Sequence, residues 1–390
     1  MLSAAQTRPI PVQSESDTAS STFDYYPSLG ELAQRTVEGI GKVVFQKNVA
    51  TGLLILAGIF MSSWTAAIGC LFGAGLATLT ASLLRSERKI LDSGVFGMNG
   101  ALTGLALFTM TGMGSNLNSL LNLNSWLWAG AGVLFSTVLV SSLSSWLHSK
   151  RLPVLAAAYC AATWLCIAAL QQFAGLSISV VRGDPNPTGL ATQAGSWATI
   201  LNGSMNAISS IFMQHGWLPA LLILLSIAIQ SRVAAVFAAA GAVAGSATAL
   251  ALGAPDTIVQ SGLYSCNAAM AAIFLGGILR GDLKHRFSYA LSGAILAIVA
   301  SAAVASILNP FGLPILLFPS VLVGWVALTA GARFRAFSEL LPEENQTDQP
   351  YLPSESDRKE LQEKNGMASD IEDISQPNEG GAYEYGTRQE

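Results

Sequence analysis

Two short apolar stretches hold the residue types that can carry a small polar solute past lipid. Leu152-Pro153 and Leu313-Pro314 each open such a stretch, and a Trp follows eleven residues after each Pro. Proline has no N–H and disrupts a helical turn, so backbone carbonyls near it lose their usual partners. Such carbonyls can replace the hydration of a neutral solute inside a pore. Pro153 and Pro314 fit equally well as structural residues in the first turn of a helix.

Catalytic chemistry finds little support in the residue types. The three histidines, His148, His215 and His285, lie near segment ends, and none accompanies paired carboxylates in an apolar run. The four cysteines show neither a disulfide pattern nor metal-ligand spacing, so we expect them to be small buried residues. We therefore expect no enzyme, no metal and no cofactor. The apolar segments also lack the acid or base that an ion-coupled carrier needs.

Composition predicts that the chain lies in a membrane. Of its 390 residues, 51% are hydrophobic and 11% are charged. Lys, Arg, Asp and Glu are absent from four long runs: 48–84, 93–149, 187–231 and 287–332. Spans of about 20 apolar residues fit a lipid bilayer, where every backbone polar group must be satisfied inside a helix. We expect an all-α polytopic membrane protein that contacts the lipid bilayer and does not bind nucleic acid.

Composition also divides the chain into five parts. The first and the last are predicted to be disordered, and the last is acidic, with 14 acids and 4 bases from Glu339 onward. Ser28 and Glu31 have the spacing of a capping box, which predicts a helix that begins there. The parts are a tail (1–27), a first transmembrane repeat (28–171), an inter-repeat linker (172–195), a second transmembrane repeat (196–338) and an acidic tail (339–390).

An internal repeat relates the two halves. The segment "LLILAGI" at 53–59 recurs as "LLILLSI" at 221–227, an offset of 168 residues that also pairs Asn99 with Asn267. The offset falls to 161 at the two Leu-Pro stretches. Gly, Asn, Pro and Trp keep their order in both halves, which indicates a duplication. An odd number of crossings in each half, about five, would invert the second copy around a central pore.

Small and polar residues inside the apolar segments have two predicted roles. The Gly-x-x-x-Gly spacings at 69–73 and 241–245 predict surfaces where helices pack closely. Asn99 and Asn267 are expected either to cap broken helices or to line the solute path.

These residues, in this order, resemble the urea transporter family. The family box LPxxTxPF occurs once in each half, and "LPVLAAAY" at 152–159 and "LPILLFPS" at 313–320 are similar to it. "FGMNGALTG" and "YSCNAAMAA" resemble a second element of each half, and "KVVFQKNVATGLLIL" at 42–56 resembles a third. The resemblance covers roughly residues 28–338.

The resemblance implies a passive, channel-like carrier of urea. Family members have ten membrane helices plus two pore half-helices in two inverted repeats, and they are typically homotrimers with one pore in each protomer. It implies a plasma (inner) membrane protein with both termini cytoplasmic, whose solute passes between aromatic rings, oxygen acceptors and Thr hydroxyls. The matched positions along the pore and substrate path are Lys42, Phe45, Asn99, Ala156, Tyr159, Ser210, Phe212, Asn267, Leu317 and Ser320, with Pro153 and Pro314 as helix-entry prolines.

Several matched positions depart from the family pattern. Ala156 and Leu317 stand where the boxes have Thr, Tyr159 and Ser320 stand where they have Phe, and Lys42 replaces a Gln. Each lost hydroxyl removes a hydrogen bond worth about 0.5–1.5 kcal/mol. Two alternatives to urea transport therefore stay open. The same fold can conduct another small neutral molecule (an amide, ammonia or water), or the protein can be a non-conducting membrane scaffold that acts through its acidic tail.

Overall fold

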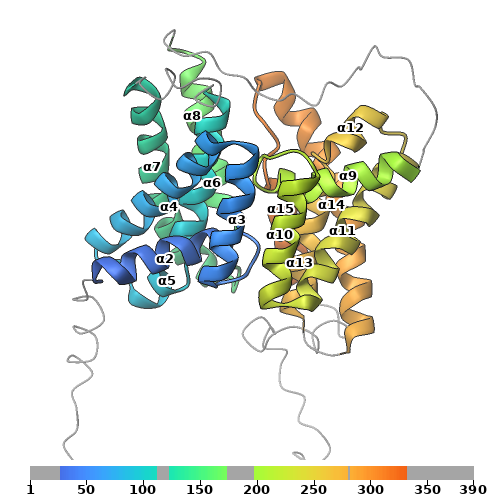
Figure 1. The fold of residues 1–390 in the computed structure, drawn as a ribbon, viewed down its shortest axis with the longest axis horizontal. Helices are drawn as coiled ribbons and strands as arrows, with labels where there is room; N and C mark the ends of the chain where they lie inside the picture. The colour runs from blue at the N-terminus through green and yellow to red at the C-terminus, as the bar shows by residue number, and fades with distance from the viewer. Residues whose placement is uncertain (1–26, 112–122, 174–196, 280–281, 332–390) are drawn as a thin grey trace, which may run out of the picture. The chain divides into compact units, whose positions relative to one another are not determined.

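The computed structural model is all-helical in the residues that it describes. These residues are 27–111, 123–173, 197–279 and 282–331, and none of them forms a strand (Figure 1). Nearly all of the two predicted tails and of the linker at 172–195 lies outside the described residues. The predicted capping box is confirmed, because the Ser28 hydroxyl accepts from the Glu31 N–H at 3.3 Å and the Glu31 carboxylate accepts from the Ser28 N–H at 2.8 Å.

The described helices fall into two series that match one another. In the first half they are α2 (Leu29–Lys42), α3 (Val49–Ser62), α4 (Trp64–Leu83), α5 (Arg88–Asp92), α6 (Val95–Met110), α7 (Leu123–His148) and α8 (Ala157–Leu170). In the second half they are α9 (Trp197–Ser210), α10 (Trp217–Gln230), α11 (Arg232–Ala251), α12 (Asp256–Ser261), α13 (Ser265–Ile278), α14 (Leu283–Leu308), the short 3₁₀ helix η2 (Asn309–Phe311) and α15 (Phe318–Gly331).

The helix boundaries recur at the offsets that relate the two halves of the sequence. Both ends of α9, α10 and α11 lie 168 residues after those of α2, α3 and α4, and α15 lies 161 residues after α8. Left-handed backbone recurs in the same way, at Phe45 (φ 62°) and Met213 (φ 54°), and at Leu155 (φ 49°) and Leu316 (φ 51°). This conformation is costly for a residue with a side chain, so its recurrence at equivalent positions shows that each half follows the same backbone path locally.

Small residues let helices of each half approach closely, as predicted. On α4, Gly73 lies directly against the backbone of Gly100 and Gly104 on α6. On α11, Gly245 lies in the same way against Ala268 of α13, where an added Cβ would overlap the alanine methyl group. Membrane helices gain little from burying apolar surface against one another, so close backbone packing of this kind is a main source of their association.

Length and surface character of the helices indicate a membrane protein. Among the described residues, α4, α7, α11 and the continuous segment of α14 with η2 are long and apolar enough to cross a membrane. The 26 residues of α14 span about 39 Å at 1.5 Å per residue, which exceeds a hydrocarbon core of about 30 Å. Large apolar side chains face outward, among them Phe60 (60% exposed), Leu127 (62%) and Val236 (58%). Such a surface suits lipid rather than water.

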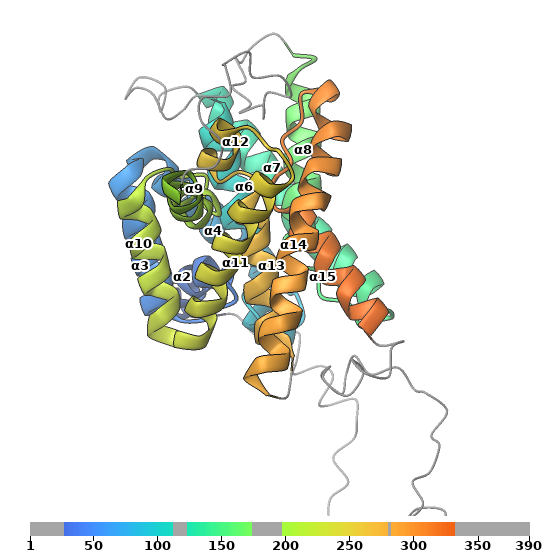
Figure 2. The same cartoon turned by 90° about the vertical axis from the view of Figure 1, so that its right-hand side faces the viewer.

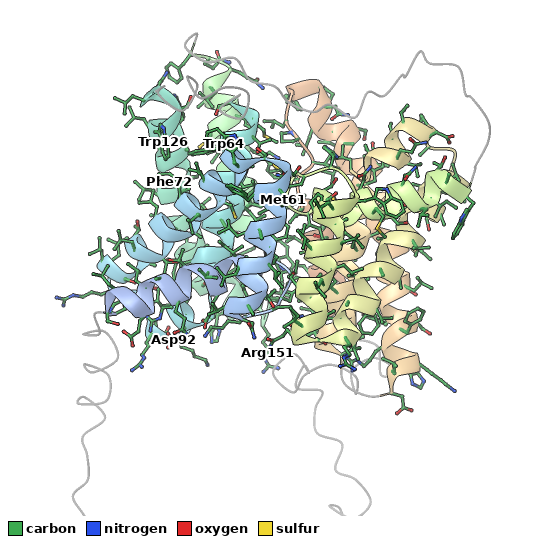
Figure 3. The ribbon with its side chains drawn as sticks, in the orientation of Figure 1. Met61, Trp64, Phe72, Asp92, Trp126 and Arg151 are labelled. Carbon is green, nitrogen blue, oxygen red and sulfur yellow. The ribbon has the colours of Figure 1, made fainter. Side chains whose placement is uncertain are left out.

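Equivalent elements of the two halves lie at opposite edges of the helical body. In Figure 1, α2 and α5 lie at the lower edge, whereas α9 and α12 lie at the upper edge. Figure 2 shows α15 descending to the lower edge, where it ends. In Figure 3, Asp92 and Arg151 lie at this lower edge, and Met61, Trp64 and Trp126 lie toward the opposite one.

Candidate solute path

The two Leu-Pro segments are held by indole groups from the opposite half. Because α8 begins at Ala157, Pro153 lies in the non-helical segment before it, and Pro314 has the same place before α15. The indole N–H of Trp164 donates to the Pro314 carbonyl at 2.7 Å, and that of Trp325 donates to the Pro153 carbonyl at 2.8 Å. The repeated spacing of Pro and Trp therefore serves two reciprocal contacts between the halves.

Asn99 joins α6 to the first box through both atoms of its side-chain amide. The Asn99 side chain is fully buried. Its Nδ2 donates to the Leu155 carbonyl at 3.0 Å, and its Oδ1 accepts from the Tyr159 N–H at 2.9 Å. Tyr159 is in the first turn of α8, where backbone N–H groups have no helical partner. The Asn99 amide is thus a cap that reaches this helix from elsewhere in the chain.

Asn267 makes the equivalent pair of bonds in the second half. It donates to the Leu316 carbonyl at 3.0 Å and accepts from the Ser320 N–H at 3.1 Å. Leu316 and its mate Leu155 are the left-handed residues of the two boxes. The carbonyls that these bends turn away from helical partners are therefore used by the protein itself.

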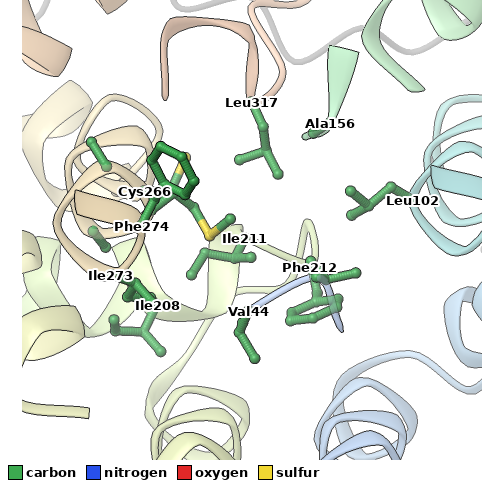
Figure 4. Packing of buried hydrophobic residues seen from close by; sticks show 14 of the residues in the cluster. Val44, Leu102, Ala156, Ile208, Ile211, Phe212, Cys266, Ile273, Phe274 and Leu317 are labelled. Carbon is green, nitrogen blue, oxygen red and sulfur yellow. The ribbon is translucent and has the colours of Figure 1, made fainter. Parts of the chain in front are cut away.

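A narrow cavity lies between the two boxes. Its volume is about 10 Å³, which is about the space that one water molecule occupies. Its walls come from both boxes, from α6 and α13, and from the turn after α2. The lining side chains that matter most are Phe45, Leu102, Ala156, Phe274, Leu317 and Ser320. In Figure 4 the side chains of Leu102, Ala156 and Leu317 point toward a common centre.

The lining of this constriction is almost entirely apolar. Phe45 and Phe274 form an aromatic pair across it, with ring centroids 5.4 Å apart and planes tilted by 42°. Ser320 is the polar side chain among the described lining residues, and its hydroxyl donates to the Leu317 carbonyl at 2.7 Å. Ala156 and Leu317 take the places of the box threonines, so the constriction offers a solute width and aromatic walls but few hydrogen bonds.

Several lining residues were not among the candidates from the sequence. Leu102 and Met270 line the constriction and lie three residues after Asn99 and Asn267, on equivalent turns of α6 and α13. The repeat offset of 168 could have found this pair. Phe274 carried no such signal, because the residue 168 positions before it is Ala106, which is not aromatic.

A larger cavity adjoins the constriction. It has a volume of about 320 Å³, and Leu317 lines both spaces. Ser210, a candidate from the sequence, lines this cavity, but its hydroxyl donates to the Ser261 carbonyl at 3.2 Å. The other groups with polar character that line it include Tyr159, His215, Tyr264 and Asn309.

Four candidate residues lie outside the lining of both cavities. Asn99 and Asn267 hold the boxes from behind, and Phe212 is fully buried in the hydrophobic cluster of Figure 4. Lys42 ends α2, a helix with charged residues that is not one of the apolar segments. Burial lowers the pKa of the Lys42 ammonium group, and the nearby charge of Lys47 lowers it further.

These features define an all-helical integral membrane protein with a constricted space between two repeated boxes, which is the construction of a membrane transport protein. The profile of the urea transporter family matches residues 33–332, more than half of the chain. The chain belongs to the urea transporter family. It is therefore a transport protein and not an enzyme.

The relatives that it resembles carry the same family name. The chain is 27% identical over 299 residues to urea transporter 1 of Ovis aries, and the match covers 75% of each protein. It is 28% identical over 286 residues to urea transporter 1 of Rattus norvegicus and to that of Mus musculus, with 71% of each protein covered.

Proposed function

We propose that this protein provides a passive path for urea, or for a closely related small neutral solute, across a membrane. The observation that carries the proposal is the uncharged constriction between the two boxes, walled by Phe45 and Phe274. An ion that entered it would lose its hydration without compensation, whereas a flat neutral solute would lose much less. The printed names of the relatives point to urea as that solute.

The proposed architecture is two inverted repeats, residues 28–171 and 196–338, of about five transmembrane helices and a pore half-helix each. Two observations support it. The helix boundaries recur at fixed offsets, and the equivalent pairs α2 and α9, and α5 and α12, lie at opposite edges in Figure 1. In transporters built this way, the solute path follows the interface of the repeats.

The proposed orientation places both termini in the cytoplasm and the protein in the plasma (inner) membrane. Basic residues favour the cytoplasmic side of a membrane. Arg88 and Lys89 of α5 and Arg151 lie at the lower edge, where α2 begins and α15 ends, whereas α12 at the upper edge carries Asp256. Proteolysis of inside-out and right-side-out vesicles distinguishes the two orientations, since only exposed termini are cleaved.

We further propose a homotrimer with one solute path in each protomer, as the family resemblance implies. Native mass spectrometry of the protein in mild detergent measures the number of subunits directly. A mass of three chains supports the proposal, and a monomer or dimer overturns it.

Urea conduction is tested by stopped-flow light scattering of proteoliposomes under an inward urea gradient. Vesicles that contain the protein are expected to recover volume faster than empty vesicles, with no dependence on a proton or sodium gradient. Recovery at the rate of empty vesicles would contradict the proposal. Equal orientation and protein content are checked by labelling before the assay.

A second candidate solute follows from the apolar lining of the constriction. With Ala156 and Leu317 in place of threonines, the space offers few hydrogen bonds to compensate a solute for lost water. A solute that needs fewer of them, such as ammonia, water or a less polar amide, is favoured by that lining. The same assay with acetamide, ammonia and an osmotic gradient alone separates this candidate from urea.

A further inference from the structure

Tyr159 is a departure from the family box that adds a polar group. The family box ends in Phe, and the phenol of Tyr159 places a hydroxyl on an equivalent ring. The residue is 1% exposed, and the Asn99 amide holds its backbone N–H at 2.9 Å. Tyr159 also lies one helical turn after Ala156, which lines the constriction. Its ring is therefore held firmly at a short distance along the chain from the narrowest point.

The larger cavity provides the space that this phenol faces. Tyr159 lines it, and so does Leu317, whose side chain also lines the constriction. The junction of the two spaces is thus walled by Leu317 from one box and has Tyr159 of the other box nearby. A solute that passes from the larger cavity into the constriction must pass this junction.

Other hydroxyl groups around the two cavities are already engaged. Each Ser or Thr hydroxyl in their described linings donates to a backbone carbonyl. The bonds are Thr109 to Leu105 (2.8 Å), Ser210 to Ser261 (3.2 Å), Ser261 to Ile258 (2.7 Å) and Ser320 to Leu317 (2.7 Å). For Tyr159, the described part of the chain holds no such bond. A hydroxyl without a protein partner that lines a cavity is available to whatever occupies that cavity.

A second tyrosine of this cavity lies farther from the constriction along its own helix. Tyr264 precedes the first residue of α13, six positions before the constriction residue Met270. Tyr159, in contrast, is three positions from Ala156. Of the two phenols, Tyr159 is the one placed to meet a solute where it leaves the larger cavity.

We infer that the Tyr159 hydroxyl is the specificity-determining group that hydrogen-bonds the solute at the mouth of the constriction. It supplies there the hydroxyl that Ala156 and Leu317 lack. A phenol O–H donates to a carbonyl oxygen, and its oxygen accepts from an N–H group. The class of solute that uses both is one with a carbonyl beside an N–H, namely ureas and primary amides. This inference rests on the proposed transport function.

The test compares Tyr159→Phe with the wild type in proteoliposomes, with urea and ammonia permeability measured on the same vesicles. Loss of one hydrogen bond is expected to lower urea permeability about 2- to 12-fold, while ammonia permeability stays unchanged. Tyr289→Phe is the matched control. Its hydroxyl donates to the Ala327 carbonyl at 3.0 Å, away from both cavities, so this variant is expected to keep the wild-type ratio of the two permeabilities.

A double-mutant cycle separates a direct contact from a general change in packing. In a Leu317→Thr background, a second hydroxyl is present at the constriction, so Tyr159→Phe is expected to lower urea permeability by a smaller factor. An unchanged urea-to-ammonia ratio in Tyr159→Phe, or the same factor in both backgrounds, overturns the inference. A wild-type protein without urea flux instead overturns the proposed function, so the two failures are distinguishable.

Discussion

Ala156 and Leu317 are equivalent residues that shape the constriction differently. Both are buried and both follow a left-handed leucine, Leu155 or Leu316, whose carbonyl is held by an asparagine. The first box therefore contributes a methyl group and the second an isobutyl group to the same small space. The width of the path is set mainly by Leu317.

Replacement of Leu317 by Thr is expected to raise urea permeability. The smaller side chain widens the constriction, and its hydroxyl adds a hydrogen bond worth about 0.5–1.5 kcal/mol, or about 2- to 12-fold. Leu317→Val is the matched control, since Val has the shape of Thr without the hydroxyl. Stopped-flow permeability of both variants separates width from hydrogen bonding. Equal urea permeability of the two variants would contradict a role for the hydroxyl.

Replacement of Lys42 by Gln is expected to stabilise the protein at neutral pH. Burial and the Lys47 charge lower the pKa of Lys42 in the folded state, so the unfolded chain binds the proton more tightly and stability rises with pH in the alkaline range. The gain from Lys42→Gln should therefore shrink as pH approaches the ordinary lysine value of about 10.4. Thermal unfolding in detergent from pH 7 to 10.5 measures it. A difference in Tm that is constant across this range would refute the explanation.

At the scale of elements, α6 and α13 position the boxes rather than line the path along their whole length. Each presents an asparagine to the bend of its own box and, one turn later, a side chain (Leu102 or Met270) to the constriction. The same helix face thus holds the box and shapes the space beside it. A loss of the asparagine should affect both.

Replacement of Asn99 by Ala is expected to destabilise the protein. It leaves the buried Leu155 carbonyl and the Tyr159 N–H without this partner, and each buried unpaired group costs about 1–3 kcal/mol. Asn206→Ala is the control, because the amide of Asn206 makes its two bonds, to Gln260 and from Gly216, at a partly exposed site. Chemical denaturation in mixed micelles should show the larger loss for Asn99→Ala. Equal losses would show that the box contact contributes no more than an exposed one.

At the scale of the whole helical body, hydrogen bonds between distant parts of the sequence hold the two halves together. Besides the two Trp-to-Pro bonds, the Thr51 hydroxyl of α3 donates to the Ser226 carbonyl of α10 at 3.0 Å. Asn48 and Gln230 join the adjacent ends of these two helices at 2.7 Å. Because the constriction has walls from both halves, these bonds help to set its width.

Deletion of residues 339–390 is expected to leave urea permeability unchanged. The residues that form the constriction and the bonds between the halves all lie before residue 332. A scaffold that acts through its acidic tail predicts instead that the shortened protein loses partner binding and that the full chain shows no flux. Permeability of the two proteins in equal amounts decides between these accounts. Loss of flux on deletion would assign the tail a role in conduction.

Much of the local structure could be predicted from the residues alone. The capping box at Ser28, the close packing at Gly73 and Gly245, and the apolar character of the membrane-capable helices all follow from short-range patterns. Such patterns work because a cap, a glycine contact surface or an apolar span depends on residues a few positions apart.

Other features were decided only by the tertiary structure. The partners of Trp164 and Trp325 lie 150 and 172 residues away, and the ring that faces Phe45 is Phe274 rather than a repeat mate. The sequence by itself determined that two similar halves of apolar helices each carry a Leu-Pro box. Which side chains narrow the path between them depends on how the halves pack, because those contacts join residues that no local pattern relates.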